Sequence, residues 1–323
     1  MQNITIEYKT EPFARAKDQF SLMYNKYYRK NRVEEVIGGE DYDLVKNAAT
    51  VCRNYLDKSY GYDYLFKLLN IENCVDHKYF PYSQKQQVIA EKDCKELINI
   101  MRKESYNDTP DSVIYPSLIM GTDKRLIKFL VRKIIDAFSS DLSGYFKSNF
   151  IPIHISAWRT NGMHEDEASK NYSYKWHVDS APSSYLKVLL YLSDYQDGGG
   201  TTEVYGYEQC MLSEKLGYSM SPLPNRKTDL RPFFKKHGVD PEPVVLQPNI
   251  GSAMLFDPTF TLHKGIAPKE GHERFAIQVS FIPFSTPYFD IEDTIVQVLS
   301  TSNGLSYPTI KVEENVVAAM NAV

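Results

Sequence analysis

The stretch Trp176-His177-Val178-Asp179 decides how this sequence is interpreted. It alternates apolar and polar side chains, and in a β-strand every second side chain points to the same face. His177 and Asp179 are therefore expected to project an imidazole and a carboxylate to one side. A third potential ligand, His263, follows far downstream. Two histidines and one carboxylate fill three positions around a non-heme Fe(II) ion and leave the others open.

A second His-x-Asp pair, His164 and Asp166, competes with this one. It lies in the polar stretch 160–170, which shows no strand alternation. A loop does not hold two ligands in a fixed geometry as a strand does, so the pair His177 and Asp179 is favoured.

The other candidates for the third ligand are His154, His237 and His272. The first precedes the motif, the second lies in a charged segment, and the third is too close to Arg274 for the two to occupy separate strands. His263 follows an apolar strand pattern and has Arg274 downstream, so it is the preferred ligand.

Arg274 opens the run Arg274–Pro283, which alternates and is rich in apolar and β-branched residues. This pattern predicts a strand. A guanidinium at its start could clamp a carboxylate through two hydrogen bonds.

Together, His177-x-Asp179, His263 and Arg274 resemble the Fe(II)/2-oxoglutarate-dependent dioxygenases. The segments LLYLSD, ending at Asp194, and GGGTTE, from Gly198 to Glu203, are similar to the prolyl-4-hydroxylase-like branch. An arginine at the clamp is nearer to the phytanoyl-CoA-hydroxylase-like and oxygen-sensing branches. The resemblance covers about residues 150–285, and the first 110 residues have no close match.

The resemblance implies Fe(II) held by His177, Asp179 and His263, with 2-oxoglutarate as cosubstrate and its C5 carboxylate on Arg274. It further implies O2 as the oxidant, possible stimulation by ascorbate, and succinate and CO2 as co-products. The reaction would oxidise a substrate C–H bond by hydroxylation, desaturation or cyclisation. Family halogenases replace the carboxylate with a small residue, so Asp179 favours these reactions over halogenation.

Tyr191, Thr202 and Arg159 are further candidates for binding 2-oxoglutarate. Tyr191 matches a position where related hydroxylases place a tyrosine on the C5 carboxylate, although a role in the barrel core is equally open. Many relatives have Arg-x-Ser at the clamp, and Ala276 replaces that serine here, which increases the need for Tyr191 or Thr202. Lys187 could face the substrate or solvent.

A small metabolite or an amino-acid-like molecule is the leading interpretation of the substrate. A protein prolyl or side-chain hydroxylase is the alternative enzyme, and a non-catalytic jelly-roll binding protein is the alternative of another class. A zinc hydrolase with the same ligands would not explain Arg274. The oligomeric state stays open.

The second half of the chain predicts eight short strands, which fit a double-stranded β-helix, the jelly-roll barrel. The expected fold class is therefore α+β and mainly β. The expected strands are Ile151–Arg159, Tyr172–Asp179, Leu186–Leu192, Thr201–Gly206, Val244–Leu246, Ala253–Phe256, Thr261–Ile266 and Phe275–Ile282.

Helical periodicity predicts that the N-terminal region supports this barrel. Residues 1–149 are expected to be mainly helical, 150–285 to form the catalytic core, and 286–323 to be an extension. The expected helices span about 14–36, 43–58, 83–103 and 123–139, with weaker signals at 290–299 and 312–323.

The segment 207–243 is expected to be a long, lid-like loop, because it contains several prolines. It also carries cations that could attract an anionic substrate, although charge runs are more often solvated faces. These cations are Lys215, Arg226, Lys227, Arg231, Lys235 and Lys236.

Composition narrows the partners and the compartment. The net charge is −4 and no basic block occurs, so no nucleic-acid partner is expected. No apolar run approaches the length of a membrane span, and no signal peptide is visible. Four cysteines without a C-x-x-C motif suggest free thiols in a reducing cytoplasm, so a cytoplasmic location is expected.

Overall fold

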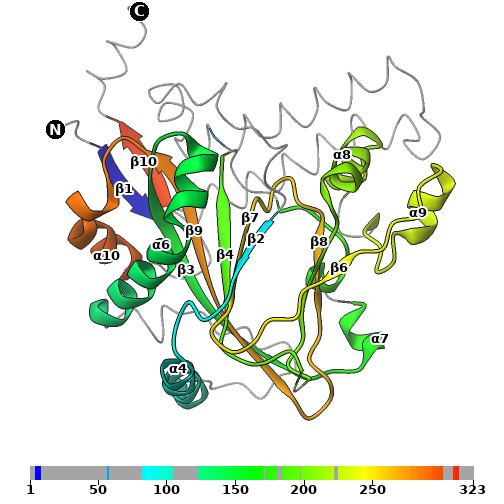
Figure 1. The fold of residues 1–323 in the computed structure, drawn as a ribbon, viewed down its shortest axis with the longest axis horizontal. Helices are drawn as coiled ribbons and strands as arrows, with labels where there is room; N and C mark the ends of the chain where they lie inside the picture. The colour runs from blue at the N-terminus through cyan, green and yellow to red at the C-terminus, as the bar shows by residue number, and fades with distance from the viewer. Residues whose placement is uncertain are drawn as a thin grey trace, which may run out of the picture.

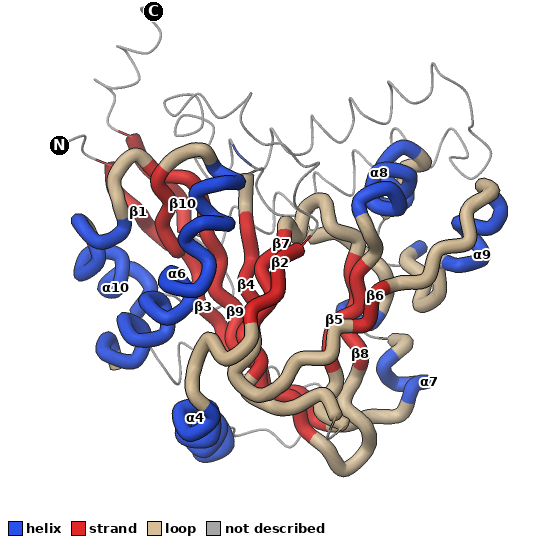
Figure 2. Tube along the Cα trace, in the orientation of Figure 1, coloured by secondary structure: helices blue, strands red, loops and turns tan. Residues whose placement is uncertain are grey.

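The computed structural model describes residues 4–8, 57, 82–104, 123–170, 172–179, 184–196, 198–221, 225–300 and 308–312. In this part, helices and antiparallel sheets combine (Figure 1, Figure 2). The expected helix over 14–36, all of 43–58 except residue 57, and all of 312–323 except Val312, which ends a strand, lie outside the described residues. Within them, no helix combines the length and apolarity needed to cross a membrane.

A five-stranded antiparallel sheet, called the major sheet here, forms the centre of the structure. The long pair β3 and β9 runs from Asn149 opposite Phe284 to Asn161 opposite Glu273. Its strands in spatial order are β2 (Tyr82–Lys85), β7 (Ala253–Phe256), β4 (Leu186–Tyr191), β9 (Glu273–Phe284) and β3 (Asn149–Asn161).

A three-stranded sheet, called the minor sheet here, lies apart from the major sheet in Figure 2. An isolated bridge between His177 and His263 extends it by one position. Its strands in spatial order are β6 (Val244–Val245), β5 (Thr201–Val204) and β8 (His263–Ile266), and a separate two-stranded sheet joins β1 (Ile4–Tyr8) to β10 (Pro308–Val312).

Three helices cover the outer face of the major sheet: α4 (Glu91–Glu104), α6 (Lys124–Phe146) and α10 (Glu292–Ser300). Their apolar stripes share one hydrophobic cluster with alternate residues of β3, including Ile155 and Ala157. Because side chains alternate along a strand, the intervening residues of β3 point to the inner face, toward the minor sheet.

The helix expected over 123–139 starts as predicted and continues to Phe146. The Asp123 side chain caps its first turn by accepting hydrogen bonds from the backbone N–H groups of Arg125 and Leu126 at 2.9 and 3.2 Å. Leu142 and Tyr145 extend the buried stripe beyond the expected end. Burial against the sheet thus offsets the modest helix propensity of the serines at 139–140.

Two expected elements near the site are wrong in part. Residues 82–85 form β2, which pairs with β7, so the helix expected from Ser83 begins only at Glu91. The major sheet therefore also takes a strand from before residue 150. The strand expected over 172–179 is a short 3-10 helix, Tyr172–Tyr174, followed by the single bridge at His177. In both places, pairing with a segment far away in the sequence determines the local structure.

The segment 207–243 is not a structureless loop. It contains α8 (Tyr207–Lys215), a 3-10 turn (Tyr218–Met220) and α9 (Arg231–Lys236). Apolar residues of these elements form a second cluster with Trp176, Val178, Tyr205 and Leu262. Those four residues alternate with His177, Asp179, Val204 and His263, so the segment packs on the outer face of the minor sheet (Figure 1).

Candidate metal centre

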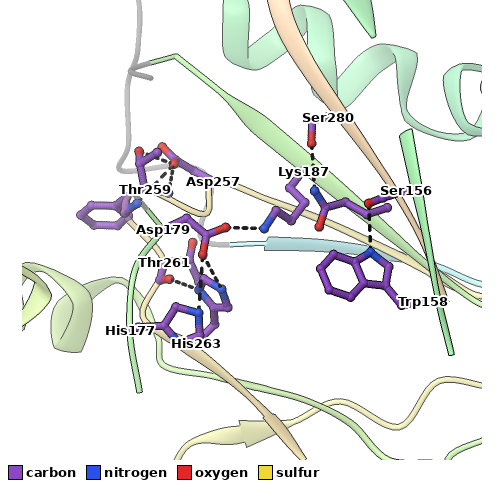
Figure 3. Close-up of polar contacts among 12 residues, drawn as sticks. Ser156, Trp158, His177, Asp179, Lys187, Asp257, Thr259, Thr261, His263 and Ser280 are labelled. Carbon is purple, nitrogen blue, oxygen red and sulfur yellow. Dashed lines mark hydrogen bonds and ion pairs between the residues drawn. The ribbon is translucent and has the colours of Figure 1, made fainter. Parts of the chain in front are cut away.

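His177, Asp179 and His263 meet between the two sheets. One potential ligand atom of each lies within 4.8 Å of those of the others. Asp179 Oδ1 is 3.5 Å from His177 Nε2 and 3.7 Å from His263 Nε2, and the imidazole centroids are 4.4 Å apart (Figure 3). Within the described residues, this is the group of histidines, cysteines and carboxylates that could hold a metal.

The backbone fixes both imidazoles in the orientation that a metal needs. His177 Nδ1 donates to the carbonyl of Lys175 at 2.6 Å, and His263 Nδ1 donates to the carbonyl of Thr261 at 2.8 Å. A carbonyl can only accept, so Nδ1 carries a proton in both imidazoles, and Nε2 of each faces the other ligands. Burial and the neighbouring His177 lower the pKa of His263 to about 3, which keeps this imidazole neutral.

The Asp179 carboxylate is shared between the metal position and a lysine. Its Oδ2 accepts a hydrogen bond from Lys187 Nζ, whereas Oδ1 faces the two histidines (Figure 3). Burial alone would raise the pKa of this carboxyl, but Lys187 and the two histidines hold it well below its usual value. Asp179 therefore stays ionised, with one oxygen directed at the metal position.

A turn anchored by Asp257 supports two of the three ligands. Its carboxylate accepts hydrogen bonds from the Tyr145 hydroxyl at 2.6 Å and from the backbone N–H and hydroxyl of Thr259 at 2.8 and 2.7 Å. In the same turn, the carbonyl of Pro258 accepts from Asp179 N–H at 2.7 Å. The sequence Asp-Pro-Thr after a buried strand signals such a turn, but this support was not predicted.

Arg274, Tyr191 and Thr202 lie on the surfaces that face each other between the sheets. Tyr191 pairs with Ala276 on β9, so it shares a face with Arg274, and its hydroxyl donates to Thr202 Oγ1 at 3.0 Å. Arg274 Nη1 donates to the carbonyl of Thr201 at 3.0 Å. Its buried Nε has no hydrogen-bond partner among the described residues. This guanidinium can therefore bind an anionic ligand by donating hydrogen bonds to it.

The structure does not bring Arg159 to this group. It lies opposite Phe275 on the outer face of the major sheet, and its Nε binds Glu273 at 2.6 Å. Arg102 of α4 binds the same carboxylate at 2.8 Å. Arg159 thus belongs to an ion-pair cluster between α4 and the sheet, on the side opposite Arg274.

The competing histidines also lie apart from the three ligands. His164 is exposed and 3.2 Å from the carboxylate of Glu270. His237 contacts the Phe233 ring edge to face at the end of α9. His154 is on the inner face of β3, opposite Ser280.

Comparisons with known proteins give only distant likenesses. No protein-family model and no curated protein matches the sequence. Among solved structures, HygX from Streptomyces hygroscopicus with nickel and 2-oxoglutarate bound is 12% identical, with a TM-score of 0.38 over 63% of this chain and 83% of that one. The α-ketoglutarate-dependent carbocyclase SnoK from nogalamycin biosynthesis is 12% identical, with a TM-score of 0.39 over 75% and 94%. The viral collagen prolyl hydroxylase vCPH from Paramecium Bursaria Chlorella virus-1 is 15% identical, with a TM-score of 0.36 over 64% and 90%.

Proposed function

We propose that this protein is an Fe(II)- and 2-oxoglutarate-dependent oxygenase that oxidises a C–H bond of a small molecule. The observation that carries the proposal is the meeting of His177 Nε2, His263 Nε2 and Asp179 Oδ1 between two sheets. A facial set of two imidazoles and one carboxylate suits non-heme Fe(II) and leaves positions open for ligands that react.

The strand connections support a double-stranded β-helix. From β3 onward the chain alternates between the sheets: β3 is major, His177 is minor, β4 is major, and β5 and β6 are minor. The strands β7, β8 and β9 then belong to the major, minor and major sheets in turn. A jelly roll closes two sheets over each other through such connections.

The donor set fits a divalent transition metal. The two histidines direct their Nε2 atoms at Asp179, and Lys187 occupies Asp179 Oδ2 so that Oδ1 remains for the metal. The carbonyls of Lys175 and Thr261 hold the imidazoles in place and increase their basicity.

Arg274 and its neighbours fit the far carboxylate of 2-oxoglutarate. The guanidinium supplies a fixed positive charge, and its Nε is a buried donor that needs an acceptor. The Tyr191 hydroxyl donates to Thr202 Oγ1, and the Thr202 hydroxyl proton is then a further donor for the carboxylate. When bound, Fe(II) would activate O2 as the oxidant, and 2-oxoglutarate would supply two electrons as it is converted to succinate and CO2.

The chain itself contributes geometry and a dry environment. His177 and His263 are only 6% and 7% exposed, so water is largely excluded from their imidazoles. This burial favours a substrate that is small enough to enter a narrow site. The carboxylate of Asp179 fills a ligand position, which favours hydroxylation, desaturation or cyclisation.

The test is the visible charge-transfer absorption that an Fe(II) ion shows when a 2-keto acid chelates it, measured under anaerobic conditions. We expect the band in the wild-type protein and its loss in His177→Ala and His263→Ala. His164→Ala is the matched control and should keep the band, because this histidine is exposed and lies in the competing motif. Absence of the band in the wild-type protein, or its loss in His164→Ala alone, would refute the proposal.

A further inference from the structure

Polar side chains occupy the inner face of the major sheet beside Asp179. His154, Ser280 and Lys187 lie side by side across β3, β9 and β4. The next row contains Ser156 and Gln278, and Trp158 follows. All of these except Trp158 are buried. This group of six residues is called the polar row here.

Four residues of the polar row contact one another in two pairs. Trp158 Nε1 donates to Ser156 Oγ at 2.9 Å (Figure 3). Gln278 Nε2 lies 3.4 Å from Ser280 Oγ. Buried sheet surfaces are usually apolar, as the outer face of this same sheet is. A buried polar wall costs free energy unless hydrogen bonds or a ligand compensate it.

Lys187 and Ser280, at one end of the polar row, lie away from the proposed 2-oxoglutarate clamp, whereas Trp158, at the other end, is opposite Ala276 and beside the clamp. Ser280 and Arg274 are on the same strand, and six residues of a strand span about 20 Å. Lys187, which pairs with Ser280, is therefore too far along the sheet to hold the same carboxylate as Arg274. Lys187 instead lies at Asp179, next to the metal ligands.

Lys187 is the cation of the polar row. Its side chain is 10% exposed. Its Nζ donates to Asp179 Oδ2 and lies 5.8 Å from the centre of the Phe256 ring. Burial and the charge of Lys187 lower the pKa of His154 to about 3, so that histidine is neutral. The nearby Asp257 carboxylate is directed to Tyr145 of α6.

Among the groups that touch the metal position or the proposed clamp, the proposed complex has one excess positive charge. A divalent metal, Lys187 and Arg274 bring four positive charges, whereas Asp179 and 2-oxoglutarate bring three negative ones. Uncompensated charge in a buried site is unfavourable, and an anionic group of the substrate would neutralise it.

We propose that the polar row is the substrate subsite and that it takes a small organic acid or amino acid, with Lys187 binding its carboxylate. This inference rests on the proposed function, because the charge balance includes the metal and 2-oxoglutarate. An ammonium carries three donors, so Lys187 can keep Asp179 and still donate to a second carboxylate. The hydroxyl of Ser280, opposite Lys187, and that of Ser156, in the next row, supply neutral hydrogen bonds beside it.

The test uses protein loaded with Co(II) and N-oxalylglycine, a non-reacting analogue of 2-oxoglutarate. The probes are free amino acids and 2-hydroxy acids, each paired with its own carboxamide, and binding is followed by the shift in melting temperature. We expect at least one acid to stabilise the loaded protein while its amide does not. In Lys187→Met, that acid should bind about 10- to 100-fold more weakly, and Lys187→Arg should retain much of the binding.

Lys85→Met is the matched control. Lys85 belongs to the same sheet but binds Asp141 at 3.2 Å, on the face covered by α6. It should respond to the acid as the wild type does.

The outcomes separate the two proposals. If Co(II) and N-oxalylglycine do not stabilise the wild-type protein, the proposed function fails. If they do, but no acid binds, or the amides bind equally, or Lys187→Met keeps the preference for the acid, then the substrate subsite is refuted. In the last case, Lys187 would serve only to hold Asp179.

Discussion

Replacing Asp257 with asparagine tests how the metal ligands are held in place. Asp257 is 1% exposed, so water does not screen its charge. It accepts hydrogen bonds from the Tyr145 hydroxyl, from the N–H and hydroxyl of Thr259, and from Phe260 N–H at 3.2 Å. Asparagine has the same shape but no charge, and one of its two terminal atoms can only donate.

The expected cost follows from these bonds. If the amide oxygen keeps Thr259, the amide nitrogen faces Tyr145, whose hydroxyl must then accept. The remaining bonds change from charged to neutral acceptors, a loss of about 1 kcal/mol each before relaxation. Because such losses are not additive, we expect the free energy of unfolding to fall by roughly 2–3 kcal/mol.

The same substitution should weaken metal binding. The turn that Asp257 organises holds Asp179 through the carbonyl of Pro258, and its Thr261 carbonyl orients His263. Changes in groups that orient metal ligands typically reduce metal affinity about 10- to 100-fold. The assay is Co(II) binding in competition with a chromophoric chelator, together with urea unfolding of the metal-free protein.

Asp229→Asn is the matched control for this experiment. The Asp229 carboxylate also accepts from a backbone N–H two residues later, at 2.9 Å from Arg231 N, but it lies at the start of α9 and is exposed. It should leave Co(II) affinity unchanged. Wild-type Co(II) affinity in a folded Asp257→Asn protein would refute the reasoning, because the turn would then not position the ligands.

Three further predictions concern cosubstrate binding and stability. Arg274→Met should raise the 2-oxoglutarate concentration needed for half-maximal charge-transfer absorption by about 100-fold or more, with Co(II) affinity unchanged, because it removes the charged partner of the far carboxylate; an unchanged requirement would place that carboxylate elsewhere. Tyr191→Phe should raise the same requirement only about 3- to 10-fold, because one neutral hydrogen bond is lost and Thr202 remains; an effect as large as that of Arg274→Met would contradict this ranking. The hydrogen bond from Arg132 lowers the pKa of Glu292 to about 2, so its stabilising contribution is present above the usual glutamate pKa and lost as the pH falls toward 2. Glu292→Gln should therefore lower the free energy of unfolding by about 1–2 kcal/mol at pH 7 and by much less near pH 2, measured by urea titration at both values; an equal loss at both values would show that charge is not the cause.

Strand alternation explains which site residues the sequence could predict. His177 and Asp179 are two apart, so they point together even though only His177 pairs with the minor sheet. The same alternation also indicates on which face of the sheet Arg159 lies. This arginine has the parity of Ile155 and Ala157, which face the helices, whereas Ser156 and Trp158 have the opposite parity. The guanidinium of Arg159 suits a carboxylate, but its position in the strand places it on the outer face.

Other features depend on contacts that no local pattern encodes. Residues 82–85 carry no clear strand signal, and they form β2 because β7 presents an open edge to them. The elements within 207–243 were hidden by prolines. Pro232 lies in the first turn of α9. Backbone N–H groups in a first turn have no partner within the helix, so a proline, which has no N–H, is tolerated there.

The position of the segment 207–243 explains how a single β-bridge can hold the metal ligand His177 in place. His177 and His263 exchange two backbone hydrogen bonds, at 3.0 and 2.9 Å, in place of a full strand ladder. The missing support comes from the outer face, where Trp176 packs on Tyr205 with ring centres 4.3 Å apart. There the hydroxyl of Tyr218 donates to the carbonyl of Trp176 at 3.0 Å, and Lys227 N–H donates to that same hydroxyl at 2.8 Å. Because a rigid first ligand requires rigid neighbours, the segment acts as a buttress behind the metal centre.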